Sequence, residues 1–153
     1  PTEINAAFGL AQLKRLALFK KRRQSNFLSL FNFFRAYEDV FILPRQHPEA
    51  DTAWLAFPLP IRKGAKFTRE ALAYYLEKRN IQTRPIFTGN VLRQPAFKNI
   101  RARRLGSGYP VADDVMRNAL LIGCHHGLSS AQLSYLKDTF REFLKANALR
   151  KIK

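Results

Sequence analysis

The sequence lacks the features of disulfide-stabilised, secreted and membrane-spanning proteins. Its single cysteine, Cys124, has no second thiol with which to form an intrachain disulfide. No N-terminal stretch combines a basic start, an apolar run and a small-residue cleavage site. No apolar run approaches the roughly 20 residues that cross a bilayer as a helix. These absences exclude a disulfide framework, predict that the chain has no membrane span, and favour the cytoplasm.

Acidic residues are scarce, and the resulting charge narrows the possible partners. Eleven Asp and Glu stand against 27 Lys and Arg, so the formal net charge is +16. A field of this sign attracts polyanions, which include nucleic acid, anionic membranes and phosphorylated metabolites. The basic residues are scattered and form no recognisable nucleic-acid-binding motif. We expect neither nucleic acid nor a membrane as partner, and a basic nucleic-acid-binding module is the alternative from another class of function.

Low-complexity tracts and internal repeats are also missing. A hydrophobic content of 46% with 13 Phe is enough for one core. Apolar residues at helical spacing from Thr2 to Phe34 predict one long helix with a kink at Ser25-Asn26. Because the chain begins with Pro1 and no Met, directly before this helix, we expect it to be part of a longer protein. The predicted organisation is a linking helix over residues 1–36 and a small α+β domain over residues 37–153.

Alternation and capping patterns locate the remaining elements. Thr52–Ile61 is apolar on both faces and predicts a covered strand, with Pro58 and Pro60 near a sheet edge or strand end. The other expected elements are a helix capped by Thr68 and ended by Asn80, a strand over 81–87, a helix over 111–119, a strand over 120–123, and a last helix begun by the capping box of Ser129 and Gln132. The predicted fold class is α+β, with a small sheet covered by helices.

Two groups of basic residues have simple structural explanations. The run Lys20–Arg23 would spread over about 300° of a helix surface, so it cannot grip one groove and is best interpreted as a solvated collar. Arg101, Arg103 and Arg104 form either a plain surface loop, which we favour, or a flexible basic loop that closes over an anion. No glycine-rich strand-to-helix turn accompanies them, so the segment is not a phosphate-binding loop.

Three further groups of titratable residues are also interpreted as structural. Cys124-His125-His126 are consecutive, and no second cluster supplies further ligands, so we predict no metal site there. His47 stands in a predicted turn without a partner nearby in sequence. Asp113-Asp114 begin a predicted helix, where the helix dipole favours negative charge.

The segment from Thr83 to Phe97 concentrates side chains that suit a nucleotide sugar. Its planar polar groups and its first aromatic ring are Arg84, Phe87, Asn90, Arg93 and Gln94. Arginine forks match diphosphate oxygens, amides can bind sugar hydroxyls, and an aromatic ring offers a surface to a sugar or base. From this chemistry alone, a substrate site and an ordinary polar loop are equally supported.

Several motifs resemble one enzyme family along nearly the whole chain. They are the opening run Pro1-Thr2-Glu3-Ile4-Asn5-Ala6-Ala7-Phe8-Gly9-Leu10-Ala11-Gln12-Leu13, then Trp54-Leu55-Ala56-Phe57-Pro58, Ile81-Gln82-Thr83-Arg84, Phe87-Thr88-Gly89-Asn90, Arg93-Gln94-Pro95 and Gly127-Leu128-Ser129. This pattern resembles the C-terminal part of the DegT/DnrJ/EryC1/StrS-type nucleotide-sugar enzymes, which use pyridoxal or pyridoxamine phosphate. The resemblance implies the small C-terminal domain of the pyridoxal-phosphate-dependent, aspartate-aminotransferase-like fold.

One loop decides the branch within this family. Sugar aminotransferases tend to place a His-Tyr pair where this chain has Ile86-Phe87-Thr88-Gly89-Asn90. The loop looks like that of the dehydrases that remove the 3-hydroxyl of a CDP-4-keto-6-deoxyhexose, a step towards the dideoxy sugars of lipopolysaccharide O-antigens. A sugar aminotransferase of the same family is the alternative.

The resemblance also implies what this chain leaves to other parts of an enzyme. The cofactor, and in this branch an iron–sulfur cluster, would be bound by a preceding domain, so the chain alone is expected to be catalytically inert. The implied partners are a nucleotide-diphosphate sugar, a second subunit in a homodimer and a reductase. From the resemblance and the side-chain chemistry, Arg84, Asn90 and Arg93 would bind the substrate, with Phe87 and Trp54 shaping its pocket and Gln94 beside them. A purely structural domain is a further alternative.

Overall fold

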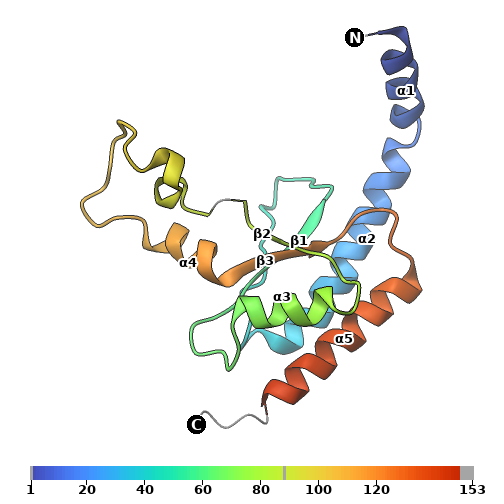
Figure 1. Cartoon of the computed structure of the whole chain (residues 1–153). Coiled ribbons are helices and arrows are strands. Elements are labelled where there is room, and N and C mark those ends of the chain that lie inside the picture. The colour runs from blue at the N-terminus through green and yellow to red at the C-terminus, as the bar shows by residue number, and fades with distance from the viewer. Residues whose placement is uncertain (1, 88, 149–153) are drawn as a thin grey trace.

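The computed structural model describes residues 2–87 and 89–148, and its elements alternate between helices and short strands (Figure 1). In chain order they are α1 (Glu3–Leu13), α2 (Leu16–Phe34), β1 (Ala56–Pro60), α3 (Arg69–Glu77), β2 (Thr83–Pro85), α4 (Pro110–Asn118), β3 (Ala119–Gly123) and α5 (Ser130–Ala148). Short 3₁₀ helices are η1 (Arg35–Tyr37), η2 (Val91–Arg93) and η3 (Pro95–Phe97). The predicted α+β class is confirmed.

The helix ends follow the capping signals of the sequence. The Thr68 hydroxyl accepts a hydrogen bond from the Ala71 amide at 3.2 Å, and Asn80, with φ of 57°, ends the turn after α3. Before α5, Ser129 and Gln132 exchange the two bonds of a capping box, at 2.9 and 3.2 Å. These local bonds satisfy backbone amides that the first helical turn leaves unpaired, so they need no tertiary contact to form.

The sheet is antiparallel, and its central strand is the last one in the sequence. The order is β1-β3-β2, with Leu59 opposite Leu120 and Thr83 opposite Ile122. Pro58 and Pro60 lie in β1, at the sheet edge, as predicted, because an edge strand does not need every amide for pairing. The strand predicted over residues 52–61 is shorter than expected, since its ladder extends only over Ala56–Pro60.

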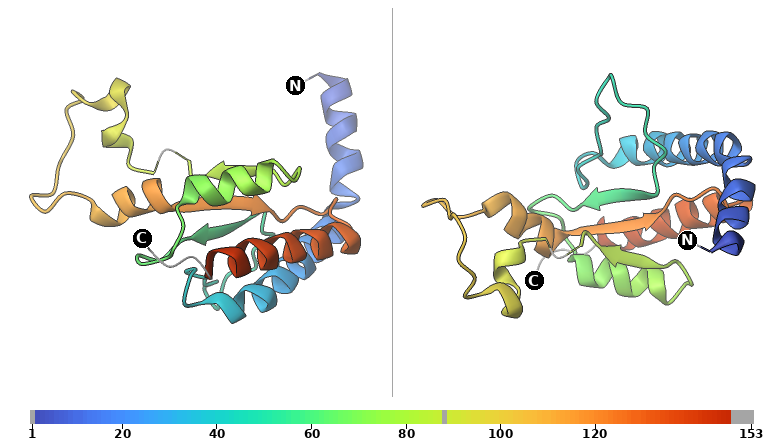
Figure 2. Two further views of the ribbon diagram at one scale, coloured as in Figure 1. Left: turned by 60° about the horizontal axis from the view of Figure 1, so that its bottom comes forward. Right: turned by 90° about the horizontal axis from the view of Figure 1, so that it is seen from above.

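Helices α2, α3 and α5 contribute to one core with one face of this sheet (Figure 2). The fully buried large side chains include Phe34 from α2, Phe57 from β1, Leu72 from α3, Leu120 from β3 and Phe140 from α5. Alternate strand residues such as Leu121 are only half-buried, and Arg84 is exposed. We expected β1 to be covered on both faces. It is buried on one face of the sheet and only half-buried on the other.

The predicted long helix is broken at a different place from the one expected. The α-helix is interrupted by a turn at Lys14-Arg15, whereas Ser25 and Asn26 lie inside the continuous α2. The Asn26 side chain is buried and donates to the His125 carbonyl at 2.8 Å, so it fastens the helix to the segment after β3 and does not bend it. The kink prediction was wrong because Asn26 serves a tertiary contact.

The two halves of the N-terminal region differ in burial. Helix α1 has no buried residue and extends away from the body, on the opposite side from the loop of residues 95–109 (Figure 1). Its exposed apolar side chains include Ile4 at 81% and Phe8 at 68% exposure. Helix α2, by contrast, supplies Phe27, Leu30 and Phe34 to the core. The division at residue 36 stays a prediction, and α2 packs with the domain that follows it.

No helix within the described ranges is long and apolar enough to cross a membrane.

Candidate functional site

The predicted site begins with a tight turn that follows β2. Phe87 has φ of 46°, and Gly89 has φ of 62°, so two neighbouring positions occupy the left-handed region. The Gly89 amide donates to the Ile86 carbonyl at 3.1 Å and closes the turn. Such a backbone conformation is unfavourable for phenylalanine. The Phe87 side chain points outward, with 87% of its surface exposed. Thr88, between them, lies outside the described residues.

Gly89 is pressed against helix α4. A Cβ atom on Gly89 would lie 2.2 Å from Cβ of Met116, closer than any non-bonded carbon pair can approach. The position therefore requires glycine for two reasons, its backbone angle and the space that Met116 leaves. This close packing sets the distance between the turn and α4.

Asn90 is anchored inside the protein. It is 7% exposed, and its Nδ2 donates to Oδ1 of Asp113 at 2.7 Å. Its Oδ1 accepts the Leu92 amide at 3.1 Å and so caps η2. Both ends of the amide thus bond to the protein, which places Asn90 in the framework of the turn.

Arg93 pairs with the same carboxylate. Its Nε donates to Oδ1 of Asp113 at 3.1 Å and its Nη2 donates to Oδ2 at 2.7 Å. The side chain of Asp113 is 10% exposed, whereas that of Arg93 is 62% exposed. The bonds from Arg93 and then from Asn90 lower the pKa of Asp113 to about 2, so the carboxylate is ionised at neutral pH. This two-pronged pair leaves Nη1 of Arg93 outside the contact.

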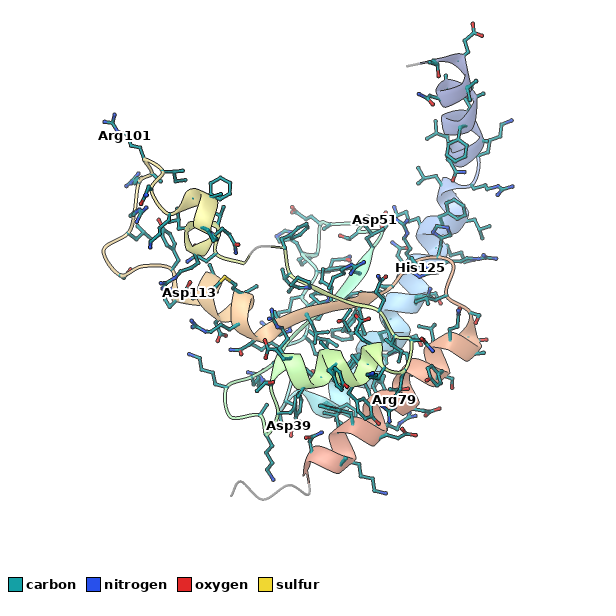
Figure 3. All side chains as sticks on the ribbon, viewed as in Figure 1. Asp39, Asp51, Arg79, Arg101, Asp113 and His125 are labelled. Atoms are coloured by element: carbon teal, nitrogen blue, oxygen red, sulfur yellow. The ribbon has the colours of Figure 1, made fainter. Side chains whose placement is uncertain are left out.

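Gln94 continues the contact with α4. Its Nε2 lies 3.9 Å from the Met116 sulfur, and the residue is half-buried. Three of the predicted substrate residues, Asn90, Arg93 and Gln94, therefore converge on Asp113 and Met116. Beyond them, Arg101 marks the exposed loop of residues 95–109 in Figure 3, and Asp113 lies on α4.

Arg84 lies apart from this group, on β2. It is exposed and lines a hollow of about 390 Å³ together with His125, Gln132 and Tyr135. Leu121, its partner across the sheet, forms part of the floor. The hollow thus occupies the sheet face that the helices leave uncovered, near the start of α5.

Trp54 lies outside both groups. Its ring stacks on Phe27 with centroids 4.4 Å apart, and its Nε1 donates to Oε1 of Gln46 at 2.9 Å. Among the described contacts none joins Trp54 to the turn of residues 86–94. Its substrate-shaping role stays a prediction.

Sequence reasoning missed the two residues that organise the turn. Asp113 was interpreted through the helix dipole, and it does lie in the first turn of α4, but its bonds go to Arg93 and Asn90. Met116 was not considered at all. The sequence offered one signal for Asp113. Acidic residues are scarce, 11 against 27 basic ones, so each Asp has many possible basic partners. The identity of its partner required the tertiary structure.

The described residues do not fit the cofactors that the resemblance implies. Every lysine in residues 2–87 and 89–148 is exposed or half-buried, whereas a Schiff-base lysine needs a desolvated pocket. Burial raises the pKa of Cys124 to about 11, and its Sγ lies 3.7 Å from the Arg23 carbonyl, so the thiolate that a cluster needs is disfavoured. Within the same ranges no group of three or more His, Cys, Asp or Glu could hold a metal ion.

Comparison with solved structures defines the class of protein. GDP-4-keto-6-deoxymannose-3-dehydratase with a trapped PLP-glutamate geminal diamine superposes with a TM-score of 0.80 at 25% identity, over 91% of this chain and 35% of that one. The fold is thus that of the small domain of the pyridoxal-phosphate-dependent, aminotransferase-like enzymes. More narrowly, the chain belongs to the DegT/DnrJ/EryC1/StrS aminotransferase family, whose sequence profile matches residues 2–141. The predicted family and fold are confirmed.

Two curated relatives add detail. Lipopolysaccharide biosynthesis protein RfbH of Salmonella typhimurium strain LT2 is 33% identical over 95% of this chain and 33% of its own length. The dTDP-4-dehydro-2,6-dideoxy-D-glucose 3-dehydratase of Saccharopolyspora spinosa is 32% identical over 94% of this chain and 30% of its own length. This chain spans about a third of the curated relatives that it matches.

Proposed function

We propose that this chain is the substrate-shaping domain of a nucleotide-sugar 3-dehydrase whose cofactor is bound by residues outside it. The observation that carries the proposal is the turn formed by residues 86–87 and 89–94, which is fastened to α4 and presents Phe87 and one edge of Arg93 outward. Sequence relatives support it, since one of them is named a 3-dehydratase of a dTDP-dideoxyhexose. The CDP-4-keto-6-deoxyhexose substrate and the O-antigen pathway follow from the resemblance of the loop.

The side chains divide into ligand-facing and supporting roles. Arg84 and Arg93 are exposed cations and can bind diphosphate oxygens, and Phe87 offers its ring to the sugar or base. Asn90 and Gln94 act chiefly by holding the turn, because their amides contact Asp113 and Met116. Trp54 stiffens the wall beside β1 through its stacking on Phe27.

The chemistry belongs to groups that other residues must hold. Pyridoxamine or pyridoxal phosphate, when bound, supplies an electron sink for the sugar. This chain would orient the nucleotide sugar and exclude water from it. An iron–sulfur cluster, a reductase partner, a homodimer and a cytoplasmic location are parts of the same proposal that follow from the resemblance alone.

An assay of the complete protein that carries this chain tests the proposal. With cofactor and a panel of cytidine, thymidine and guanosine diphosphate 4-keto-6-deoxyhexoses, we expect loss of the 3-hydroxyl, and we expect no turnover by the 153-residue chain alone. Arg84→Ala and Phe87→Ala should each raise KM by about tenfold. Unchanged KM in both variants would leave the chain with only a structural role.

A sugar aminotransferase is the second candidate, because the matching family is described as one of aminotransferases. The two activities give different products from one substrate. Dehydration removes the 3-hydroxyl, whereas transamination in the presence of an amino donor adds nitrogen to the sugar. Mass spectrometry of the product distinguishes them, and nitrogen retained in the sugar would favour the aminotransferase.

A further inference from the structure

We propose that Asp113 is a positioning residue of the substrate site, which turns Arg93 so that its free Nη1 edge meets the diphosphate of the nucleotide sugar. This inference rests on the proposed function and assigns a role to a residue that does not touch the substrate. It also separates the two functions of Arg93, one edge for the protein and one for the ligand.

The geometry of the pair carries the inference. A guanidinium is a flat fork with donors on two edges, and its Nε and Nη2 edge is filled by Asp113 at 3.1 and 2.7 Å. A guanidinium held on one edge cannot rotate about the terminal bonds of the arginine side chain. The direction in which Nη1 points is therefore set as well. Among the described residues no hydrogen bond engages Nη1, and 62% of the Arg93 side chain as a whole is exposed.

Asp113 is itself held in place, so it can orient Arg93. Its side chain is 10% exposed, it lies in the first turn of α4, and it also receives the Asn90 amide at 2.7 Å. Three donated hydrogen bonds satisfy most of the carboxylate. The contact of Gly89 with Met116 brings the same turn against the same helix, so backbone and side chains are fastened together.

The charge of the chain as a whole still favours an anion. Near the pair, Arg93 and Arg117 are matched by Asp113 and Asp114, and Arg117 adds to the lowering of the Asp113 pKa by Arg93 and Asn90. The net charge of +16 attracts a diphosphate, while the ion pair supplies direction. A single mobile arginine would lose more rotamer entropy on binding the same ligand.

Variants at 113, 114 and 93 separate positioning from simple support. Asp113→Asn keeps the shape and removes the charge that aligns Arg93. The matched control is Asp114→Asn, since the neighbouring Asp114 accepts from Asn118 at 2.8 Å and, among the described residues, has no hydrogen bond to Asn90 or Arg93. Arg93→Lys keeps the cation and the fold but cannot form a two-pronged pair.

In the complete protein we expect Asp113→Asn and Arg93→Lys each to raise KM for the nucleotide sugar by about tenfold, with kcat within about twofold and the Asp114→Asn control unchanged. In the 153-residue chain, amide exchange of residues 89–94 should speed up in Asp113→Asn and stay unchanged in Asp114→Asn.

The outcomes also separate this inference from the proposed function. If Arg84→Ala and Phe87→Ala raise KM but Asp113→Asn and Arg93→Lys do not, the inference is wrong and the proposed function stands. If none of the four changes KM, the proposed function itself fails. A loss of kcat and thermal stability in Asp113→Asn, with KM unchanged, would assign Asp113 a purely structural role and overturn the inference.

Discussion

Arg93 and Asp113, 20 positions apart in the sequence, form a two-pronged ion pair that joins the turn after β2 to helix α4. Asn90 donates to the same carboxylate, so a single acidic side chain fastens the segment that follows Gly89 to α4.

Substitution of Gly89 by alanine should destabilise the turn. The added methyl would overlap Met116 at 2.2 Å, and φ of 62° disfavours any side chain, so we expect a cost of about 1–3 kcal/mol. Gly108→Ala is the matched control, because Gly108 has φ of 71° but nothing within 4 Å of its added Cβ. Chemical denaturation measures both, and equal effects would mean that the Met116 contact contributes nothing.

The contact of the turn with α4 should survive to low pH. The pKa of Asp113 falls to about 2 through its bonds from Arg93 and Asn90, below about 3.9 in an unfolded chain. Its stabilising contribution is therefore complete above pH 4 and is lost as the pH falls towards 2. NMR titration of the Asp113 carboxyl carbon follows this directly. A midpoint near 4 would show that the ion pair does not form in solution.

Cys124 should resist thiol reagents in the folded protein. Burial raises its pKa to about 11, so very little thiolate exists at pH 8, and reagent access is blocked as well. We expect modification at least about a hundredfold slower than in the urea-unfolded chain. Rapid labelling at pH 8 without loss of helical circular dichroism would contradict the described packing.

Phe34 should be among the most costly core positions to truncate. It is fully buried and lies against Phe57 and Phe140, with ring centroids 5.5 and 4.9 Å away. Phe34→Ala should lower the free energy of unfolding by about 3–5 kcal/mol. Phe8→Ala, on the exposed α1, should change it by less than about 0.5 kcal/mol. Similar costs at both sites would show that α1 packs on the domain.

Helix α1 should cause the isolated chain to self-associate. Its apolar side chains, including Ile4 and Phe8, are exposed along a helix without a buried residue. Sedimentation should show association that Phe8→Glu weakens, while the surface change Glu49→Gln, in the loop between α2 and β1, should not. A monomer at all concentrations would contradict the prediction.

Local signals accounted for the helix ends and for the family. Thr68, Asn80 and the Ser129–Gln132 capping box act through bonds that span only a few residues, so the sequence shows both partners together. The segment from Thr83 to Phe97 was singled out from its residue types and its motifs, although the strand predicted over 81–87 extends only over Thr83–Pro85.

Long-range relationships required the folded chain. No sequence pattern indicates that β3 enters the middle of the sheet, because strand order depends on which apolar faces meet. The break at Lys14-Arg15 was likewise invisible, and Asn26 was misjudged because its partner lies 99 residues away.

The sequence by itself determined the fold class, the capped helices, the family and the segment that matters. Tertiary structure alone decided the roles within that segment. It turned Asn90 and one edge of Arg93 inward onto Asp113, left Phe87 outward, and placed Arg84 in a separate hollow. The physical reason is that a polar side chain reveals its chemistry in the sequence, while its partner is chosen by burial, where an unpaired charge would be too costly to keep.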